Sequence, residues 1–93
     1  MMQQDKAETI AIQALGWLAA DQDLFQTFLG ASGMNVNDLK EMAADPQFLG
    51  AVLDFILMTD STVTGFCDSA GLGYDMPMQA RHSLPGGEMV NWT

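Results

Sequence analysis

A short apolar stretch near the middle of the chain reads Asp45-Pro46-Gln47-Phe48-Leu49-Gly50-Ala51-Val52-Leu53-Asp54-Phe55-Ile56-Leu57-Met58, and it determines the architecture that we expect. Asp45 suits the N-cap of a helix, because its carboxylate can accept hydrogen bonds from the unpaired first-turn amides. Pro46 suits the next position, where its missing N–H costs nothing. After Pro46 the only polar or side-chain-free residues are Gln47, Gly50 and Asp54, whose spacing places them on one narrow stripe. A helix over about 46–58 must therefore be surrounded by other helices.

A membrane-spanning role for this stretch is disfavoured. The apolar run is shorter than the roughly 20 residues that a spanning helix needs, and Asp54 interrupts it. The chain has few β-branched residues, and its helix-breaking residues fall between the apolar segments. We therefore expect an all-α fold, a compact bundle of five or six short helices around the central apolar helix.

Capping and breaking residues divide the rest of the chain into helices. The expected elements are a helix over 6–20 begun by Asp5, a second begun by Asp21 or Asp23 and ended by Gly33, a short third begun by Asn35, the central helix, a fifth begun by Asp60 and ended by Gly71, and a sixth begun by Asp75 with Pro77 in its first turn. We expect both glycines to adopt the left-handed conformation. Residues 1–4 are expected to fray, residues 5–87 to form one domain, and residues 88–93 to form a tail.

The inward side of the fifth helix is expected to carry Val63, Phe66, Cys67 and Ala70. The two halves of the chain also resemble each other at a spacing of 38 residues, which aligns Phe28 with Phe66 and Gly33 with Gly71. A duplicated three-helix unit would explain this spacing. Similar punctuation of unrelated helical hairpins would explain it equally well.

The charge of the chain restricts its partners. Three basic and twelve acidic residues give a formal net charge of −9. Nucleic acids and anionic membrane surfaces require clustered Lys and Arg, whereas Lys6, Lys40 and Arg81 are scattered. We therefore expect no nucleic-acid or membrane partner, although a helix-turn-helix-like order of elements and mimicry of DNA stay as remote alternatives. A basic protein partner is compatible with the acidity, and so is a simple role in solubility.

Cysteine usage and the N-terminus indicate a compartment. A single cysteine, Cys67, allows no internal disulfide and is typical of reducing conditions. Residues 1–6 contain no basic region that leads into an apolar one, so no signal peptide is expected. These features predict a cytoplasmic protein.

Catalytic and metal-binding patterns are weak in this sequence. Cys67 and His82 are the only nucleophile and base of the usual kind, and an enzyme or small-ligand pocket near Asp54, Cys67 or His82 is the alternative function. The acidic pair at Asp21 and Asp23 lacks the oxygen ligands that follow in a calcium loop, and it is better explained by helix capping. We expect no metal and no cofactor.

The clearest functional pattern is an apolar, methionine-rich C-terminal region. Its candidate partner-binding residues are Met76, Met78, His82, Met89 and Trp92. Flexible methionine surfaces adapt to partners, so the leading prediction is a non-enzymatic module that binds an unknown protein partner or forms a homodimer. The simpler alternative is that the tail docks on its own domain.

Three blocks of the chain resemble a known family. They are residues 14–21 (Ala-Leu-Gly-Trp-Leu-Ala-Ala-Asp), residues 45–55 and residues 81–87 (Arg-His-Ser-Leu-Pro-Gly-Gly), and the likeness covers about residues 7–87. They are similar to recurring blocks of a small alphaproteobacterial family of unknown function. The resemblance implies a bacterial, cytoplasmic, helical protein, and it transfers no activity and no site residue.

Overall fold

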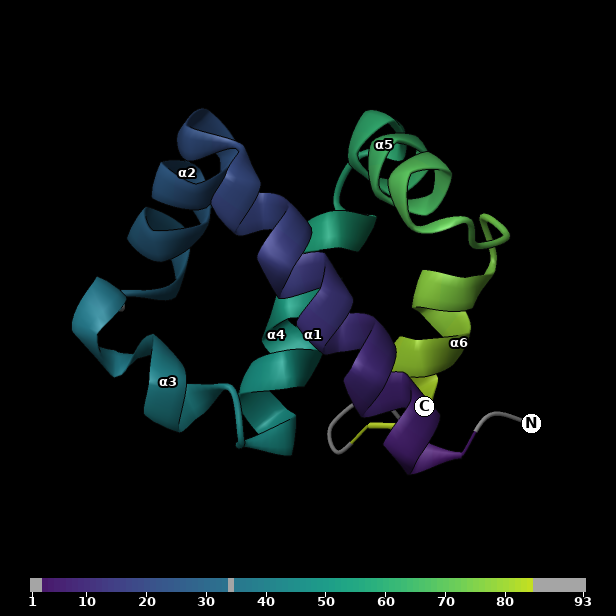
Figure 1. Ribbon diagram of the computed structural model, residues 1–93, viewed down its shortest axis with the longest axis horizontal. Helices are drawn as coiled ribbons and strands as arrows, with labels where there is room; N and C mark the ends of the chain where they lie inside the picture. The colour runs from purple at the N-terminus through teal and green to yellow at the C-terminus, as the bar shows by residue number, and fades with distance from the viewer. Residues whose placement is uncertain (1–2, 34, 85–93) are drawn as a thin grey trace, which may run out of the picture.

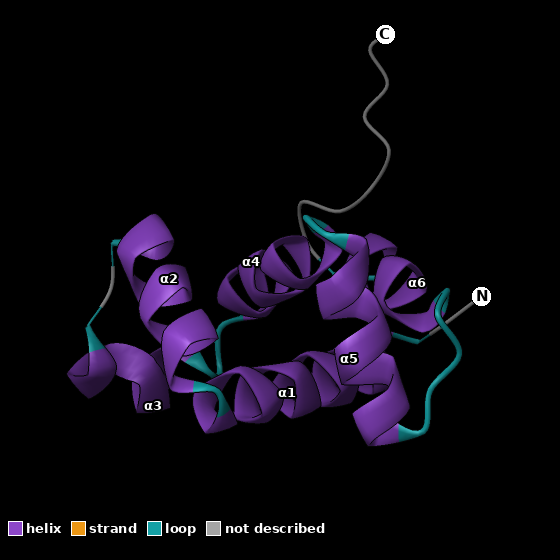
Figure 2. Ribbon diagram, turned by 90° about the horizontal axis from the view of Figure 1, so that it is seen from above, coloured by secondary structure: helices purple, strands orange, loops and turns teal. Residues whose placement is uncertain are grey.

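The computed structural model describes residues 3–33 and 35–84, except for the side chains of Ser32, Val36 and Lys40. Its elements are α1 (Gln4–Ala20), α2 (Gln22–Ser32), the short 3-10 helix η1 (Val36–Asp38), α3 (Leu39–Met42), α4 (Pro46–Leu57), α5 (Asp60–Ala70) and α6 (Met76–His82). No strand occurs among the described residues (Figure 2), and the predicted all-α bundle is confirmed. The molecule measures 33 × 26 × 25 Å along its principal axes.

Two helices, α1 and α4, cross at the centre of the bundle (Figure 1). Each of them contacts α2, α5 and α6 as well as the other. The prediction placed α4 alone at the centre, and the structure shows that α1 shares this position. The reason is the small side chains on the inner face of α1, where the fully buried residues Ala7, Ala11 and Ala14 allow close packing of neighbouring helices.

The large buried side chains come from every long helix. They are Ile10 and Leu18 of α1, Phe28 of α2, Leu49, Val52, Leu53 and Ile56 of α4, Phe66 of α5, and Leu84 after α6. Aromatic contacts connect α2 to α4, because the ring of Phe28 lies 5.9 Å from that of Phe48 and 5.4 Å from that of Phe55. One continuous apolar core therefore holds all the long helices together.

The start of α4 follows the predicted chemistry. The side chain of Asp45 accepts a hydrogen bond of 2.9 Å from the amide of Gln47, and Pro46 occupies the first helical position. Of the predicted polar stripe, Gln47 and Asp54 are exposed. Gly50 is buried instead, because a side chain from α6 covers it.

Two helices end at glycines in the left-handed conformation, as predicted. Gly33 has φ 72° at the end of α2, and Gly71 has φ 71° at the end of α5. After Gly71, the amide of Leu72 donates to the carbonyl of Cys67 at 2.9 Å, and the Leu72 side chain packs against the core. The amide of Gly71 also donates to the carbonyl of Cys67, so both bonds satisfy this carbonyl in the last turn of α5.

Some predicted details are wrong. Helix α1 begins at Gln4 rather than at residue 6, so Asp5 lies in its first turn and does not cap it. The N-cap of α5 is Thr59 rather than Asp60, and the hydroxyl groups of Thr59 and Thr62 form a hydrogen bond. An acidic residue within the first turn is also favourable for a helix. An acidic residue near the start of a helix therefore does not by itself distinguish the N-cap from the first turn.

The buried side of α5 differs from the prediction at its two ends. Ala70 is exposed and Thr62 is buried, whereas Phe66 and Cys67 are buried as expected. The side chain of Trp17 from α1 contacts this helix. Its ring lies against Gly65, within 3.0 Å of the place where a Cβ would stand, and 6.0 Å from the ring of Phe66.

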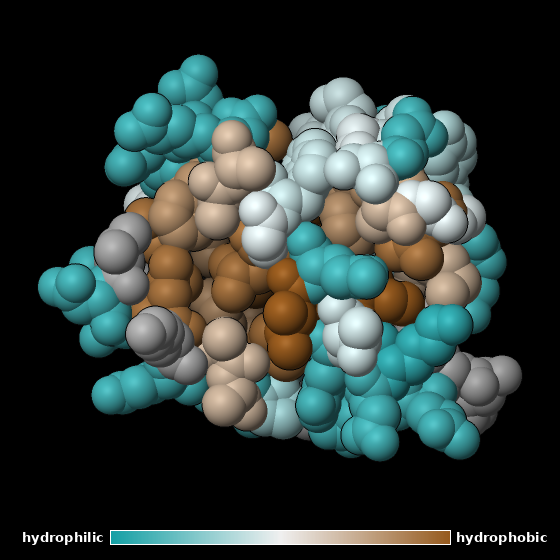
Figure 3. Space-filling view, viewed as in Figure 1, coloured by the Kyte–Doolittle hydropathy of each residue, from teal (hydrophilic) through white to brown (hydrophobic). Residues whose placement is uncertain are grey.

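One face of the bundle is hollowed and apolar. Figure 3 shows apolar side chains gathered between α2, α3 and the middle of α1. Leu24 and Phe25 of α2 and Leu39 and Met42 of α3 are half-buried and pack against the core. We name this surface the α2–α3 face.

No single helix within residues 3–33 and 35–84 is long and apolar enough to cross a membrane, although the pair α4 and α5, bent by 112°, meets the length and composition criteria.

Candidate functional site

An open groove lies where α5 and α6 diverge from the end of α4. It has a volume of about 640 Å³, and its lining consists of Leu57 of α4, Asp60, Val63 and Thr64 of α5, Tyr74 and Asp75 of the following loop, and Met78 of α6. Apolar groups from three helices form its walls, and Asp60 and Asp75 lie exposed on its rim. We name it the α5–α6 groove.

Of the polar residues that line the groove, Asp60 and Asp75 are acidic, Tyr74 is hydrogen-bonded to an acid, and Thr64 is neutral. The hydroxyl of Tyr74 donates a hydrogen bond of 2.8 Å to Asp68, and this bond, with the nearby carboxylate charge, raises the pKa of Tyr74. The carboxylate of Asp75 accepts a hydrogen bond from the side chain of Gln79. Among the described residues, neither Lys nor Arg lines the groove. The surface around it is therefore negative, and it would attract cations.

A smaller notch lies on the other side of the last turn of α4. Its volume is about 170 Å³, and it is lined by Phe28 and Ala31 of α2 and by Ala51, Asp54, Phe55 and Met58 at the α4 side. Leu57 lines the groove and the next residue, Met58, lines the notch, so the two hollows are neighbours. Met58 is 73% exposed between α4 and α5. We name this second hollow the α2–α4 notch.

An ion pair joins α6 to α4 beside these hollows. The guanidinium of Arg81 donates to both carboxylate oxygens of Asp54, with 2.6 Å between Nε and Oδ1 and 3.1 Å between Nη2 and Oδ2. Nη1 lies 2.8 Å from the place where a Cβ on Gly50 would stand. The side chain of Arg81 is 16% exposed and that of Asp54 is 57% exposed. Gly50, Asp54 and Arg81 together form what we call the Arg81 clamp.

The alternative catalytic residues do not share one of these hollows. Cys67 is buried, and its thiol donates to the carbonyl of Gly73 at 3.5 Å. Burial raises the pKa of the Cys67 thiol, and the charges of Asp68 and Asp75 raise it further. A protonated thiol is a poor nucleophile. His82 is exposed at the end of α6 and lines neither the groove nor the notch.

Among the described residues, no group of three or more His, Cys, Asp or Glu side chains could hold a metal ion.

The structure separates the predicted partner-binding residues. Met78 lines the α5–α6 groove and is 54% exposed, whereas Met76 is half-buried and packs against the core. His82 lies one turn beyond Met78 on α6, outside the groove. Met89 and Trp92 fall outside the described residues.

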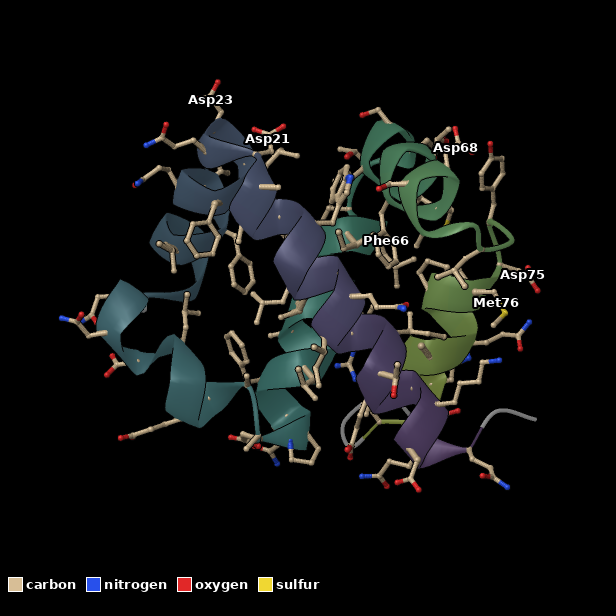
Figure 4. The ribbon with its side chains drawn as sticks, in the orientation of Figure 1. Asp21, Asp23, Phe66, Asp68, Asp75 and Met76 are labelled. Carbon is tan, nitrogen blue, oxygen red and sulfur yellow. The ribbon has the colours of Figure 1, made fainter. Side chains whose placement is uncertain are left out.

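Tyr74 and the two rim carboxylates of the groove were not predicted as site residues from the sequence. Tyr74 is 57% exposed and stands in the loop between α5 and α6. An exposed aromatic residue beside Asp75 in a short connection was the one pattern that could have indicated it. Figure 4 shows Asp68, Asp75 and Met76 on the α5–α6 side, far from Asp21 and Asp23 at the start of α2.

Comparison with known proteins gave one family. A family profile described as "Protein of unknown function (DUF3572)" matches residues 4–87 of the chain. The match confirms the resemblance inferred for residues 7–87, and it does not test the bacterial origin. No curated protein and no solved structure matches the chain.

Proposed function

We propose that this chain, which belongs to the DUF3572 family of unknown function, is a non-enzymatic binding module for a positively charged, apolar segment of another protein. The observation that carries this proposal is the α5–α6 groove, whose apolar walls of Leu57, Val63 and Met78 are bordered by Asp60 and Asp75. A basic amphipathic helix could place apolar side chains in the groove and its cations at the rim.

Charge distinguishes this partner from the other occupants. A second copy of the chain also carries a net charge of −9, so two acidic surfaces would have to meet. The tail of the same chain, residues 88–93, contains Glu88 and neither Lys nor Arg. A basic segment would be attracted to this acidic surface, whereas a second copy of the chain would be repelled and the tail would not be attracted.

The magnitudes assign separate roles to the two kinds of contact. An exposed ion pair contributes at most about 1 kcal/mol, and about 1.4 kcal/mol corresponds to a tenfold change in affinity. Two rim carboxylates therefore raise the affinity for the partner about tenfold, and burial of apolar groups must supply most of the binding free energy. Exposed aromatic and methionine side chains such as Tyr74 and Met78 suit this role.

The test uses a designed amphipathic helix of leucine and lysine as the probe, with a leucine and glutamate helix as its counterpart. We expect fluorescence anisotropy to show binding of the lysine peptide alone to the full chain. Side-chain methyl resonances of Leu57 and Val63 should shift on binding. If the methyl resonances of the α2–α3 face shifted and those of the groove did not, the binding site would be the α2–α3 face.

A matched pair of double variants separates the groove from general acidity. Asp60→Asn with Asp75→Asn removes two rim charges, whereas Asp5→Asn with Asp23→Asn removes two first-turn acids of α1 and α2. Each pair changes the net charge from −9 to −7. We expect the rim pair to weaken binding about tenfold and the control pair to weaken it far less. Equal weakening, or no binding by the lysine peptide, would overturn the proposal.

A further inference from the structure

The α5–α6 groove has one wall that depends on a very short helix. Met78 belongs to α6, which contains seven residues, and Asp75 is the N-cap of this helix. A helix of this length has about two turns, and Pro77, Ala80 and the half-buried Met76 pack it against the core. These apolar contacts are non-directional, so a directional polar contact is needed to define the rotation of α6 about its own axis.

The Arg81 clamp supplies the missing constraint. The two hydrogen bonds from Arg81 to Asp54 have the planar, two-pronged geometry that permits one orientation of the guanidinium. Gly50 contributes by lacking a side chain, because the guanidinium occupies the place beside its Cα. Arg81 lies three residues after Met78, so both residues belong to the same turn of α6. A fixed orientation of the Arg81 side chain therefore also restricts the position of Met78.

We infer that Arg81 is a positioning residue, which through Asp54 and Gly50 holds α6 at the rotation that sets the Met78 wall of the groove. This role in recognition rests on the proposed function of the groove, whereas the hold on α6 can be measured without any ligand. Arg81 does not line the groove and is not expected to contact the partner.

Two variants disturb the clamp by different routes. Asp54→Asn keeps the shape of the acceptor and removes its charge, and Gly50→Ala displaces the guanidinium without changing any charge. Asp23→Asn is the control for the charge removed at Asp54. The charge exchange Asp54→Arg with Arg81→Asp restores an ion pair and serves as the rescue.

Amide hydrogen exchange in the full chain is the first measurement. The amide of Gln79 donates to the carbonyl of the N-cap Asp75, and the amide of the C-cap Ser83 donates to the carbonyl of Gln79. In the two clamp variants we expect the exchange rates of both amides to rise about fivefold more than those of the buried amides of α1, whose rates change only with the free energy of global unfolding. Rates at Gln79 and Ser83 that rise no more than those of α1 would overturn the inference, whatever the groove binds.

Affinity for the leucine and lysine peptide is the second measurement, made well below the melting temperature of every variant. We expect about fivefold weaker binding for Asp54→Asn and Gly50→Ala, no change for Asp23→Asn, and recovery in the charge exchange. Faster exchange with unchanged affinity would show that the clamp holds α6 without shaping the groove, and would overturn the inference. Failure of the wild-type chain to bind the peptide would overturn the proposed function. Amide hydrogen exchange alone would then test whether the clamp holds α6.

Discussion

At the scale of single residues, glycines reveal where side chains from distant elements meet a helix. Among the described residues, Gly16 in α1 meets no atom from outside its own turns of helix within 4 Å of the place of a Cβ, whereas Gly50 in α4 has the Arg81 guanidinium at 2.8 Å. Both lie inside helices, where Ala is more favourable than Gly by about 0.5–1 kcal/mol. The same substitution should therefore have different effects at the two positions.

We expect Gly16→Ala to stabilise the protein by about 0.5–1 kcal/mol. Gly50→Ala should lack this gain, because the displaced Arg81 side chain and the weakened ion pair, worth at most about 1 kcal/mol, offset the gain in helix propensity. Urea unfolding with equal m-values would measure both changes. An equal gain at both positions would mean that Arg81 moves away from Gly50 without cost.

Tyr74 reports on its contact with Asp68. It is the single tyrosine of the chain, so ultraviolet titration observes it alone. The hydrogen bond to Asp68 raises its pKa, so it should ionise above the usual value of about 10. Asp68→Asn should return the titration toward that value, because it removes the charge that favours the protonated phenol. An unchanged midpoint in the variant would contradict the contact.

The ionisation of the Cys67 thiol should lower the stability of the fold at alkaline pH. Burial raises the pKa of its thiol in the folded state, so the unfolded chain releases this proton at a lower pH. The stabilising contribution is complete below the unfolded pKa, about 8.5, and it is lost as the pH rises through the folded pKa. We expect wild type to lose more stability between neutral and alkaline pH than Cys67→Ala. Identical slopes would show that the thiol ionises equally easily in both states.

At the scale of elements, local chemistry predicted where helices begin and end, but it could not predict which helices touch. Asp45-Pro46, Gly33 and Gly71 act on their own turns, so the sequence alone was sufficient there. Gly50 was assigned to the polar stripe of the central helix, and its burial could not be predicted because its cover, Arg81, comes from a distant helix. Tyr74 belongs to no periodic pattern, and the groove that it lines exists only once α5 and α6 are placed relative to α4.

The contact between α1 and α5 offers a test at this scale. The ring of Trp17 lies 3.0 Å from the place of a Cβ on Gly65 and also packs against Phe66. A rigid aromatic ring cannot yield as a flexible chain can, so Gly65→Ala should separate the two helices slightly. We expect a loss of about 1–2 kcal/mol in thermal unfolding and a changed Trp17 emission. A gain in stability like that expected for Gly16→Ala would show that the contact is loose.

At the scale of the whole molecule, charge opposes the compact state. The chain has twelve acidic and three basic residues, and Arg81 with Asp54 is the one salt bridge recorded within the described part of the chain. Most carboxylates therefore repel one another without compensation, which lowers stability through self-repulsion. The same negative field that would attract a basic partner to the groove is a cost to the isolated fold.

Salt should consequently stabilise this protein. At about 0.3 M salt the screening length is well below 10 Å, so repulsion between separated carboxylates weakens more than the short contact between Arg81 and Asp54. We expect the melting temperature to rise by a few degrees between low and moderate sodium chloride concentration in calorimetry. The Asp5→Asn with Asp23→Asn variant, which carries two fewer negative charges, should respond less. A melting temperature that falls with salt would show that attractive pairs dominate, and the acidic surface would then no longer be free to meet a basic partner.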